Sequence, residues 1–370
     1  MKKQVVKTKI LISGGGTGGH IYPAIAIANE LKKRDENIDI LFIGAKGRME
    51  MEKVPAAGYE IIGLPVRGLH RNLTIKNINV LFKLLISLIK AANTIRKYKP
   101  DLVVGTGGYA SSPALKAAAN RGIPTVIQEQ NSYAGITNRI LGRKAKKICV
   151  AYDGMDKYFP KDKIVLTGNP VREDVLNMET KIDEALKYFN ISGTRKVLLI
   201  IGGSLGAYTI NKSVSANLDL IGETNIDVIW QTGKLYFDSM QESLKNSKVN
   251  NVKIMDFITK MDLAYSIADV IISRAGAGSI SELCIAGKPL ILVPSPNVAE
   301  NHQTKNAMFL VNKNAAMVIK DSCAKKEMIP KAIQLMADEK LAKSMAHNCK
   351  KLGIKNSTVK IVDELYKLLN

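Results

Sequence analysis

The chain has 370 residues, of which 46% are hydrophobic, and this composition excludes an intrinsically disordered protein. Its formal net charge of +21, from 54 lysines and arginines against 33 acidic residues, favours a polyanionic partner. No RNP motif, zinc finger or helix-turn-helix is recognisable, so we expect an anionic membrane surface or a phosphorylated substrate and no nucleic acid. The length predicts two domains.

Cysteine usage and hydropathy predict a protein of the reducing cytoplasm. The four cysteines lie far apart and form no CxxC pair, which disfavours both a disulfide framework and a zinc site. The basic N-terminal segment carries an apolar run too short for a signal peptide. The most apolar segment, residues 80–92, is interrupted by Lys83 and Lys90, so no membrane-spanning helix is expected.

Short β-branched runs alternate with amphipathic segments through the first half of the chain. Such runs, with little polar alternation, are typical of buried parallel strands, and their alternation with helices predicts a doubly wound α/β sheet. The expected strands are residues 9–13, 39–44, 101–108, 124–131, 147–152 and 163–169.

The same order of strand, glycine turn and helix restarts at residues 195–214, roughly 190 residues after its first occurrence. Further strands are expected at residues 227–233, 253–258, 269–276 and 289–294. We therefore predict two Rossmann-like domains, residues 1–168 and 169–355, with a hinge near residues 167–174. A last helix, about residues 356–370, could pack back on the first domain. A cleft between the two domains is the expected site.

The first glycine turn raises a dinucleotide hypothesis, because Gly14, Gly16 and Gly19 satisfy G-x-G-x-x-G. That fingerprint also needs an acid near the end of the second strand to hold a ribose diol. The expected second strand ends in residues 44–46, which are Gly, Ala and Lys, so NAD is a minority hypothesis. No G-x-x-x-x-G-K-[ST] motif occurs, which excludes a P-loop.

His20 directly follows the last glycine of this turn, in the first turn of the expected helix. The positive end of the helix should lower the pKa of the imidazole and keep it neutral, as a general base on a sugar hydroxyl must be. The alternative is a histidine that merely caps the turn. The residues alone leave these two interpretations about evenly balanced.

A second candidate site lies in the segment SRAGAGSISELC, residues 273–284. Ser279 is a natural N-cap and Glu282, three residues on, a capping-box partner. Alternatively, the Glu282 carboxylate binds both hydroxyls of a ribose. The histidines are scattered and no Asp-x-Asp pair exists, so no metal site is expected. A diphosphate leaving group would then need helix dipoles, backbone N–H groups and a side chain such as Arg172.

Six motifs, in this order, resemble those of the MurG family of peptidoglycan glycosyltransferases over nearly the whole chain. They are GGGTGGHIYPAIAIA, GTGGYASSPAL, QEQNSYAGITNRIL, GNPVRED, IGGSLGA and SRAGAGSISELCIAGKPLILVP.

The resemblance implies a GT-B fold of two facing Rossmann-like domains with a deep cleft. It implies inverting transfer of N-acetylglucosamine from UDP-GlcNAc to the C4 hydroxyl of the MurNAc-pentapeptide of undecaprenyl-linked lipid I, giving lipid II and UDP. It implies no cofactor. It also implies a peripheral enzyme on the cytoplasmic face of the plasma membrane, acting in cell-wall biogenesis.

The resemblance also assigns site residues in the first half of the chain. His20 and Glu129 match the candidates for the base and for a polar partner on the acceptor side. Asn131 matches a sugar-contacting asparagine. The turn near the donor sugar and the acceptor diphosphate corresponds to Thr17, Gly18 and Gly19.

In the second half, Arg172 and Ser204 match residues near the donor phosphates, and the backbone of Ile258 matches a uracil contact. Gln303 resembles the glutamine that holds the GlcNAc hydroxyls, although an insertion before it makes the match less direct. The nucleotide loop, with Glu282 on the ribose, corresponds to Ala277, Gly278, Ser279, Ile280, Ser281 and Glu282.

Two positions depart from the family pattern. Gln128 stands where a histidine often precedes EQN, and Leu205 stands where GGSQGA has a glutamine. The loss of that glutamine removes one polar contact near the donor phosphates. Both departures affect the fine geometry of the site and leave the class of enzyme unchanged.

Lysines recur every seven residues, at positions 76, 83, 90 and 97, and form one slowly drifting stripe on the expected helix. The hypothesis is a basic surface that lies on an anionic membrane, formed by Lys76, Lys83 and Lys90 with Arg67, His70 and Arg71. The alternative is an ordinary solvated face. The apolar residues that mostly face elsewhere are expected in the core, and they are Ile78, Leu81, Leu85, Leu88, Ala92 and Ile95.

Overall fold

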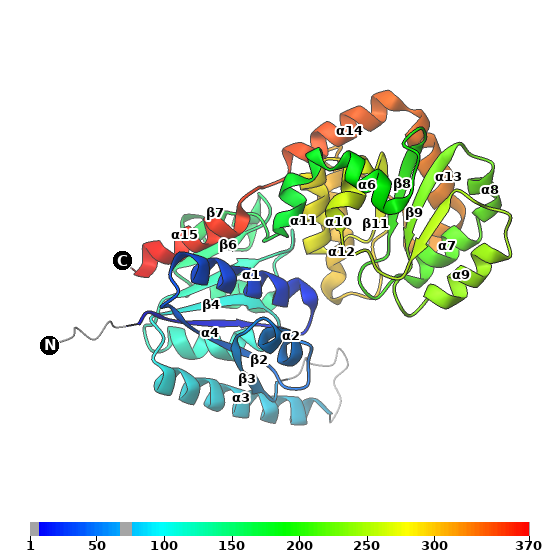
Figure 1. Ribbon diagram of the computed structural model, residues 1–370. Helices are drawn as coiled ribbons and strands as arrows, with labels where there is room; N and C mark the ends of the chain where they lie inside the picture. The colour runs from blue at the N-terminus through cyan, green and yellow to red at the C-terminus, as the bar shows by residue number, and fades with distance from the viewer. Residues whose placement is uncertain (1–6, 67–75, 370) are drawn as a thin grey trace. The chain divides into compact units, whose positions relative to one another are not determined.

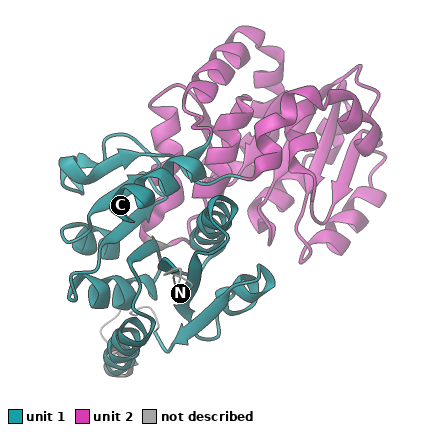
Figure 2. Cartoon of the chain, turned by 60° about the vertical axis from the view of Figure 1, so that its left-hand side comes forward, with its two compact units in different colours: residues 1–171, 356–370 teal, residues 172–355 magenta. Residues whose placement is uncertain are grey.

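Two parallel sheets carry the fold, one in each of the two units into which the chain divides (Figure 2). The computed structural model describes residues 7–66 and 76–369. The first unit comprises residues 1–171 and 356–370, and the second comprises residues 172–355. The division thus falls three residues beyond the boundary expected from the sequence.

The sheet of the first unit has the order β3-β2-β1-β4-β5-β6-β7, with every pair of neighbours parallel. The central strands are apolar on both faces because helices cover both sides, as a parallel sheet requires. The strands are β1 (Lys9–Gly14), β2 (Asp39–Ala45), β3 (Glu60–Leu64), β4 (Leu102–Gly107), β5 (Thr125–Glu129), β6 (Lys147–Val150) and β7 (Ile164–Leu166).

Helices α1 (Gly18–Arg34) and α15 (Ser357–Leu369) cover one face of this sheet, and α3 (Lys76–Tyr98) and α4 (Ser111–Ala119) cover the other (Figure 1). Two shorter helices, α2 (Glu50–Ala56) and α5 (Ile136–Gly142), follow β2 and β5. Alternate residues of each central strand point to opposite faces, so the sheet has two separate cores.

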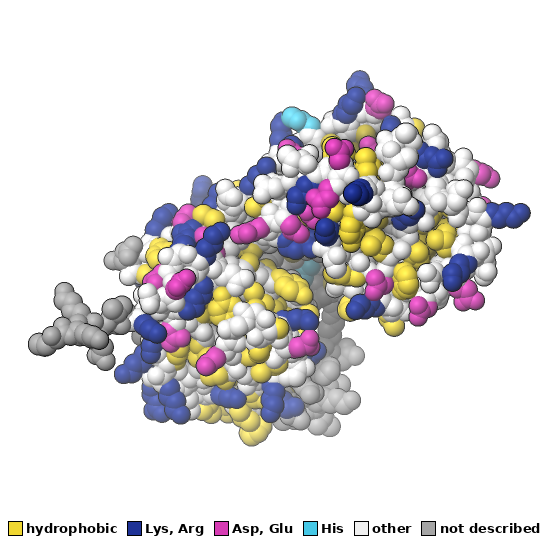
Figure 3. Space-filling model, viewed as in Figure 1, with side chains coloured by type: hydrophobic (Ala, Val, Ile, Leu, Met, Phe, Trp, Pro, Cys, Tyr) yellow, Lys and Arg dark blue, Asp and Glu magenta, His cyan; other side chains and the backbone are white. Residues whose placement is uncertain are grey.

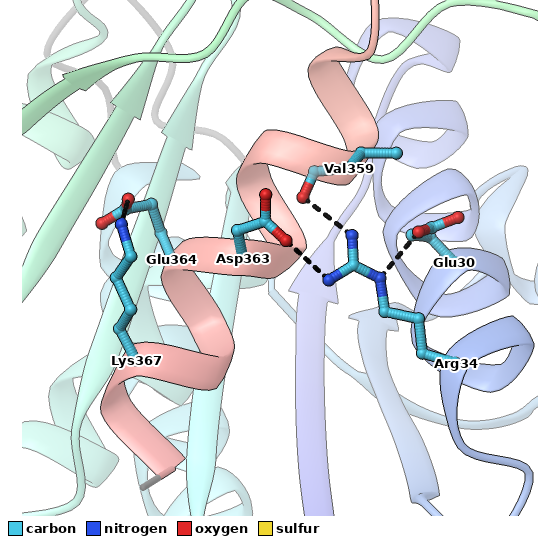
Figure 4. Close-up of polar contacts among 6 residues, drawn as sticks. All are labelled: Glu30, Arg34, Val359, Asp363, Glu364 and Lys367. Carbon is cyan, nitrogen blue, oxygen red and sulfur yellow. Dashed lines mark hydrogen bonds and ion pairs between the residues drawn. The ribbon is translucent and has the colours of Figure 1, made fainter.

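The C-terminal helix α15 completes the core beneath α1 although the whole second unit separates the two helices in sequence. Its residues Ile361, Val362 and Leu365 are fully buried in the cluster that contains the α1 side chains. At the rim, Arg34 donates to Asp363 at 2.6 Å and to the Val359 carbonyl at 3.2 Å (Figure 4). Burial of the apolar side chains, rather than this partly exposed ion pair, holds the helix in place.

The second unit repeats the pattern with the order β10-β9-β8-β11-β12-β13, again all parallel. Its strands are β8 (Lys196–Ile201), β9 (Ile226–Gln231), β10 (Val252–Met255), β11 (Val270–Ser273), β12 (Leu290–Leu292) and β13 (Met317–Val318).

Helices cover both faces of this second sheet. One face packs against α7 (Tyr208–Ser215), α8 (Leu218–Gly222), α9 (Phe237–Lys245) and α13 (Ala324–Ala337). The remaining helices are α6 (Ile182–Phe189), α10 (Met261–Ile267), α11 (Ala277–Ala286), α12 (His302–Val311) and α14 (Glu339–Lys351). Short 3₁₀ segments occur at residues 155–157, 161–163, 173–180, 299–301 and 321–323.

Two strands were not expected from the sequence. Both β3 and β13 lie at sheet edges, and most of their residues are only half-buried, so neither forms a buried apolar run. Among the described residues, no helix combines the length and the apolar character that crossing a bilayer demands.

We predict that Leu365→Ala lowers the free energy of unfolding by about 3 kcal/mol, because it leaves a cavity among fully buried side chains. Asp363→Ala, two residues away on the same helix, removes only a partly exposed ion pair and should cost less than about 1 kcal/mol. Urea unfolding followed by circular dichroism gives both values. Equal losses in the two variants would contradict this, because the ion pair would then anchor α15 as strongly as the buried core does.

Candidate functional site

In each sheet the order of strands reverses at one point, between β1 and β4 in the first unit and between β8 and β11 in the second. Open α/β sheets bind ligands at such switch points, just beyond the carboxyl ends of the strands. Both glycine turns predicted from the sequence lie there, after β1 and after β8. Each unit therefore carries its own candidate subsite.

The glycine turn of the first unit is pressed against the turn that follows β4. The Gly15 N–H donates to the Gly107 carbonyl at 3.2 Å. A Cβ atom on Gly108 would lie 2.1 Å from the Gly15 oxygen, so only glycine fits there. The hydroxyl of Thr106 donates to the His20 carbonyl at 2.8 Å and ties the start of α1 to the same strand end.

His20 lies in the first turn of α1 and is held through Nδ1. That nitrogen is 3.0 Å from the Gly15 carbonyl oxygen and 3.3 Å from the Thr17 hydroxyl. Because a carbonyl oxygen can only accept, Nδ1 carries the hydrogen in this arrangement. In the neutral ring Nε2 is then the basic nitrogen. The helix begins at Gly18, and the Thr17 side chain makes no capping bond to the backbone.

Glu129 is buried, and its oxygens accept hydrogen bonds from the residues that follow it. The donors are the backbone and side-chain nitrogens of Asn131, the Gly135 N–H and the Asn138 amide, at 2.8–3.3 Å. Burial raises the pKa of the Glu129 carboxyl, and these bonds oppose the rise. Through these bonds Glu129 orders the loop that presents Asn131.

Gln128, the first departure from the family pattern, belongs to a buried network of side-chain amides. The Gln128 amide donates to Asn169 at 2.8 Å, and Asn169 donates to the Gln130 carbonyl at 3.0 Å. Gln130 in turn donates to the Thr106 carbonyl at 2.6 Å. The end of β5, the Gly-Asn-Pro turn and the end of β4 are thereby fixed to one another.

In the second unit, the glycine turn between β8 and α7 packs against the end of β9. The Gln231 amide donates to the Gly203 carbonyl at 2.9 Å. The exposed Ser204 lies in this turn, four residues before α7 begins, and the N–H groups at the start of that helix favour an anion. Leu205, the second departure, has 82% of its surface exposed, so it takes no part in the core.

Glu282 lies in the second turn of α11 and does not cap the helix. The N-cap is Gly276, Ser279 lies inside the helix, and residues 277–282 are helical rather than a loop, which corrects the capping-box interpretation. The Glu282 carboxylate accepts from the hydroxyl of Tyr265 at 3.2 Å and pairs with Nε of Arg172 at 3.2 Å.

Burial raises the pKa of the Glu282 carboxyl, whereas Arg172 and the Tyr265 hydroxyl lower it by stabilising the charged form. Tyr265 is itself fully buried, and burial raises the pKa of its phenol well above the usual value. The phenol is therefore a hydrogen-bond donor to the carboxylate. No local sequence signal marks Tyr265, which lies 17 residues away on α10.

Gln303 connects two loops at strand ends. Its side-chain oxygen accepts from the N–H groups of Ala275 at 3.3 Å and Ser295 at 2.8 Å, so a ligand would meet its amide nitrogen. The preceding residues, Glu300 and Asn301, both have φ of 53°, a strained backbone of the kind found at functional sites. Ile258 lies in the loop before α10 with its side chain buried.

The basic surface predicted on α3 is only partly described. Arg67, His70 and Arg71 lie outside the described residues, as does the side chain of Lys76. The Lys83 side chain is half-buried, and Lys90 is exposed and donates to the Gly63 carbonyl at 2.8 Å.

The expected core face of α3 is partly wrong. Ile95 is buried as predicted, but Leu85 is 54% exposed. It belongs to an apolar surface with Phe82 and Ile89, because α4 and the sheet cover only one side of the long helix. We call Phe82, Leu85, Ile86 and Ile89 the apolar face of α3.

Two domain families match the chain. Residues 10–150 match the glycosyltransferase family 28 N-terminal domain, and residues 197–364 match the C-terminal domain of the same family.

Named relatives are similar over nearly the whole length. An enzyme of Parabacteroides distasonis named UDP-N-acetylglucosamine–N-acetylmuramyl-(pentapeptide) pyrophosphoryl-undecaprenol N-acetylglucosamine transferase is 54% identical, over 98% of this chain and 99% of its own. The enzyme of the same name from Flavobacterium psychrophilum is 52% identical over 98% of both chains. The crystal structure of Acinetobacter baumannii MurG has a TM-score of 0.80 at 29% identity, over 97% of this chain and 99% of that one.

We predict that Tyr265→Phe and Arg172→Ala each raise the pKa of the Glu282 carboxyl further, because each removes a group that stabilises its charged form. NMR titration of protein with ¹³C-labelled glutamate measures this, with Glu282→Gln identifying the resonance. Ser266→Ala is the matched control, since that hydroxyl lies on the same helix as Tyr265 and donates to the Leu263 carbonyl within it. An unchanged midpoint in Tyr265→Phe would contradict the assigned hydrogen bond.

Proposed function

Because the chain belongs to glycosyltransferase family 28, and within it to the MurG-type enzymes, we propose that it transfers N-acetylglucosamine from UDP-GlcNAc to lipid I. The product is lipid II, and the fold is GT-B. Similarity to MurG-type enzymes over 98% of the chain, together with a histidine whose basic nitrogen is fixed at a switch point, supports the assignment most strongly.

The second unit binds the nucleotide donor. The Glu282 carboxylate accepts from the ribose hydroxyls, with Tyr265 keeping it oriented. Ser204 and the start of α7 bind the diphosphate. Gln303 donates its amide to the sugar, and the backbone of Ile258 and residues 277–281 contact the nucleoside.

Arg172 is suited to stabilise the leaving diphosphate. Its ion pairs with Glu282, at 3.2 Å, and with Asp174, at 3.7 Å, both use Nε. The two terminal nitrogens of this partly exposed guanidinium can therefore donate to phosphate oxygens. Stabilising the charge that develops on UDP is the largest electrostatic task of the reaction.

The first unit binds the acceptor and supplies the base. His20 Nε2 takes the proton from the C4 hydroxyl of the muramoyl sugar as that oxygen bonds to the anomeric carbon. The bond between the anomeric carbon and the phosphate oxygen breaks on the opposite side, and UDP leaves with the electron pair. Thr17, Gly18 and Gly19 contact the donor sugar and the acceptor diphosphate, and Asn131 contacts a sugar.

A related transferase with another sugar or lipid acceptor is the nearest rival. UDP release by the full chain, measured in EDTA with UDP-GlcNAc and a short-chain lipid I analogue, separates the two. Release that needs both substrates supports the proposal. UDP-GlcNAc hydrolysis or binding without transfer to lipid I would contradict the acceptor assignment.

We predict that His20→Ala lowers kcat about 100-fold or more, the size typical of a lost general base, while UDP affinity stays unchanged because the second unit provides it. His347→Ala, at an exposed position on α14, is the matched control and should behave as the parent. Steady-state kinetics and UDP binding by calorimetry give the two readouts. Parent-like turnover in His20→Ala would remove the residue from the mechanism.

The enzyme is further proposed to lie on the anionic, cytoplasmic surface of the plasma membrane through α3. The apolar face of α3 leaves 62% of Phe82 and 55% of Ile89 exposed. A contiguous exposed apolar patch of this kind marks a surface that binds a membrane or a partner. Lysines of the predicted stripe flank it, among them Lys83 and Lys90, as an amphipathic interfacial helix requires.

The residues around α3 support docking of the membrane against this helix. In Figure 3, yellow side chains gather along the lower edge of the first unit, where Figure 1 places α3, with dark blue side chains beside them. Ile86 and Ile89 also line a groove of about 730 Å³ between α3 and the sheet, with Lys90 and Lys97 along it. Apolar surface and basic charge thus lie together on one side of the unit.

We predict that the double variant Phe82→Ser with Ile89→Ser binds anionic vesicles at least about tenfold more weakly, because each side chain contributes roughly 1.5–3 kcal/mol when buried. Ile182→Ser is the matched control, because Ile182 on α6 of the second unit is 51% exposed. Vesicle sedimentation measures binding, and UDP binding verifies the fold. Equal sedimentation of the double variant and the parent would exclude α3 as the docking surface.

A further inference from the structure

Glu50 is a buried carboxylate to which the proposed mechanism gives no role. It is the first residue of α2, and none of its surface is exposed. One carboxylate oxygen accepts from the Ala45 N–H at 2.9 Å, and the other accepts from the Gly16 N–H at 3.0 Å. A buried carboxylate is costly unless its oxygens are satisfied, so both hydrogen bonds are structurally significant.

The glycines around Glu50 are fitted to it. A Cβ atom on Gly15 would lie 2.0 Å from a Glu50 carboxylate oxygen, and one on Gly44 would lie 2.6 Å from its Cγ. Any side chain at either position would therefore displace the carboxylate. The end of β2 and the turn after β1 are built to admit Glu50 between them.

The Gly16 N–H and the Gly15 carbonyl belong to the same peptide group. Glu50 accepts from the N–H side of this peptide, and His20 Nδ1 donates to its carbonyl side at 3.0 Å. Because the peptide group is planar, fixing its N–H direction also fixes the direction of its carbonyl. A carboxylate, one peptide group and an imidazole thus form a continuous chain of hydrogen bonds.

This chain has two effects on His20. It holds the ring in the Nδ1–H tautomer, which makes Nε2 the basic nitrogen. It also strengthens the acceptor, because a carboxylate bonded to the peptide N–H polarises the carbonyl at the other end. A carboxylate often orients a catalytic histidine by direct contact; here one backbone peptide lies between the two.

We propose that Glu50 is a positioning residue for His20 and acts through the Gly15–Gly16 peptide to fix the tautomer and orientation of the imidazole. This proposal rests on the proposed role of His20 as the base. Glu50 lies five residues after the end of β2 and binds backbone N–H groups, whereas the acid of a dinucleotide fingerprint would bind a ribose.

The test is Glu50→Gln, which keeps the shape of the side chain but turns one acceptor into a donor facing a backbone N–H. The matched control is Glu52→Gln on the same helix, where the carboxylate is 77% exposed and pairs with Lys53. ¹⁵N NMR of the four histidines reports the tautomer of His20, with His20→Ala identifying its signals. UDP release reports kcat and the KM for UDP-GlcNAc.

Glu50→Gln should lower kcat by roughly tenfold or more, as misplacement of a catalytic group does, and leave the KM for UDP-GlcNAc within about twofold. The His20 signals should change from the Nδ1–H form to a mixture of tautomers, and Glu52→Gln should match the parent throughout. A parent-like kcat or a parent-like His20 spectrum in the folded variant overturns the proposal.

Two further outcomes have defined meanings. If Glu50→Gln does not fold, the same criteria apply to Glu50→Asp, which keeps the charge but is too short to reach both N–H groups. If His20→Ala turns over normally, the base assignment fails, and the His20 spectrum alone decides whether Glu50 positions the ring.

Discussion

The close approach of two backbone turns, after β1 and after β4, is the constraint on which the proposed catalytic side of the first unit depends. The Gly15 N–H reaches the Gly107 carbonyl, and Gly108 lies so near Gly15 that a single methyl group would collide with it. His20 takes its position from this contact, since its Nδ1 bonds to Gly15 and its carbonyl to Thr106. The glycines are therefore required here by backbone packing, independently of any phosphate that the turn binds.

The second unit uses the same order of strand, turn and helix but supports its glycine turn differently. A Cβ atom on Gly206 would lie 2.0 Å from the Thr232 carbonyl, so this turn packs against the end of β9. In the first unit, by contrast, the turn after β1 packs against the turn after β4. Gln231, at the end of β9, binds the Gly203 carbonyl, whereas Glu50, shortly after β2, binds a turn N–H. One repeated topology thus carries the proposed base in one unit and the proposed anion-binding turn in the other.

Most of the fold followed from the sequence because buried parallel strands and glycine turns are local signals. The edge strands β3 and β13 could not be predicted, because half-exposed strands lack a continuous apolar run. In the candidate site, the segments containing His20 and Glu282 could be recognised, but the partners Glu50 and Tyr265 could not. They lie 34 and 17 residues from the groups they bind, and only tertiary packing brings them there. The prediction that Leu85 lies in the core was wrong, because helical periodicity identifies an apolar side but not whether a neighbouring element covers it.

Because α15 belongs to the first unit, that unit cannot be completed until α15 has been translated. The core beneath α1 needs Ile361, Val362 and Leu365, which the ribosome delivers after the entire second unit. The second unit is contiguous in sequence and can fold while synthesis continues. The first unit, although translated first, is completed last, and until then the part of α1 that packs against α15 stays uncovered. A nascent chain of this protein therefore carries an unfinished N-terminal domain throughout the translation of its C-terminal half.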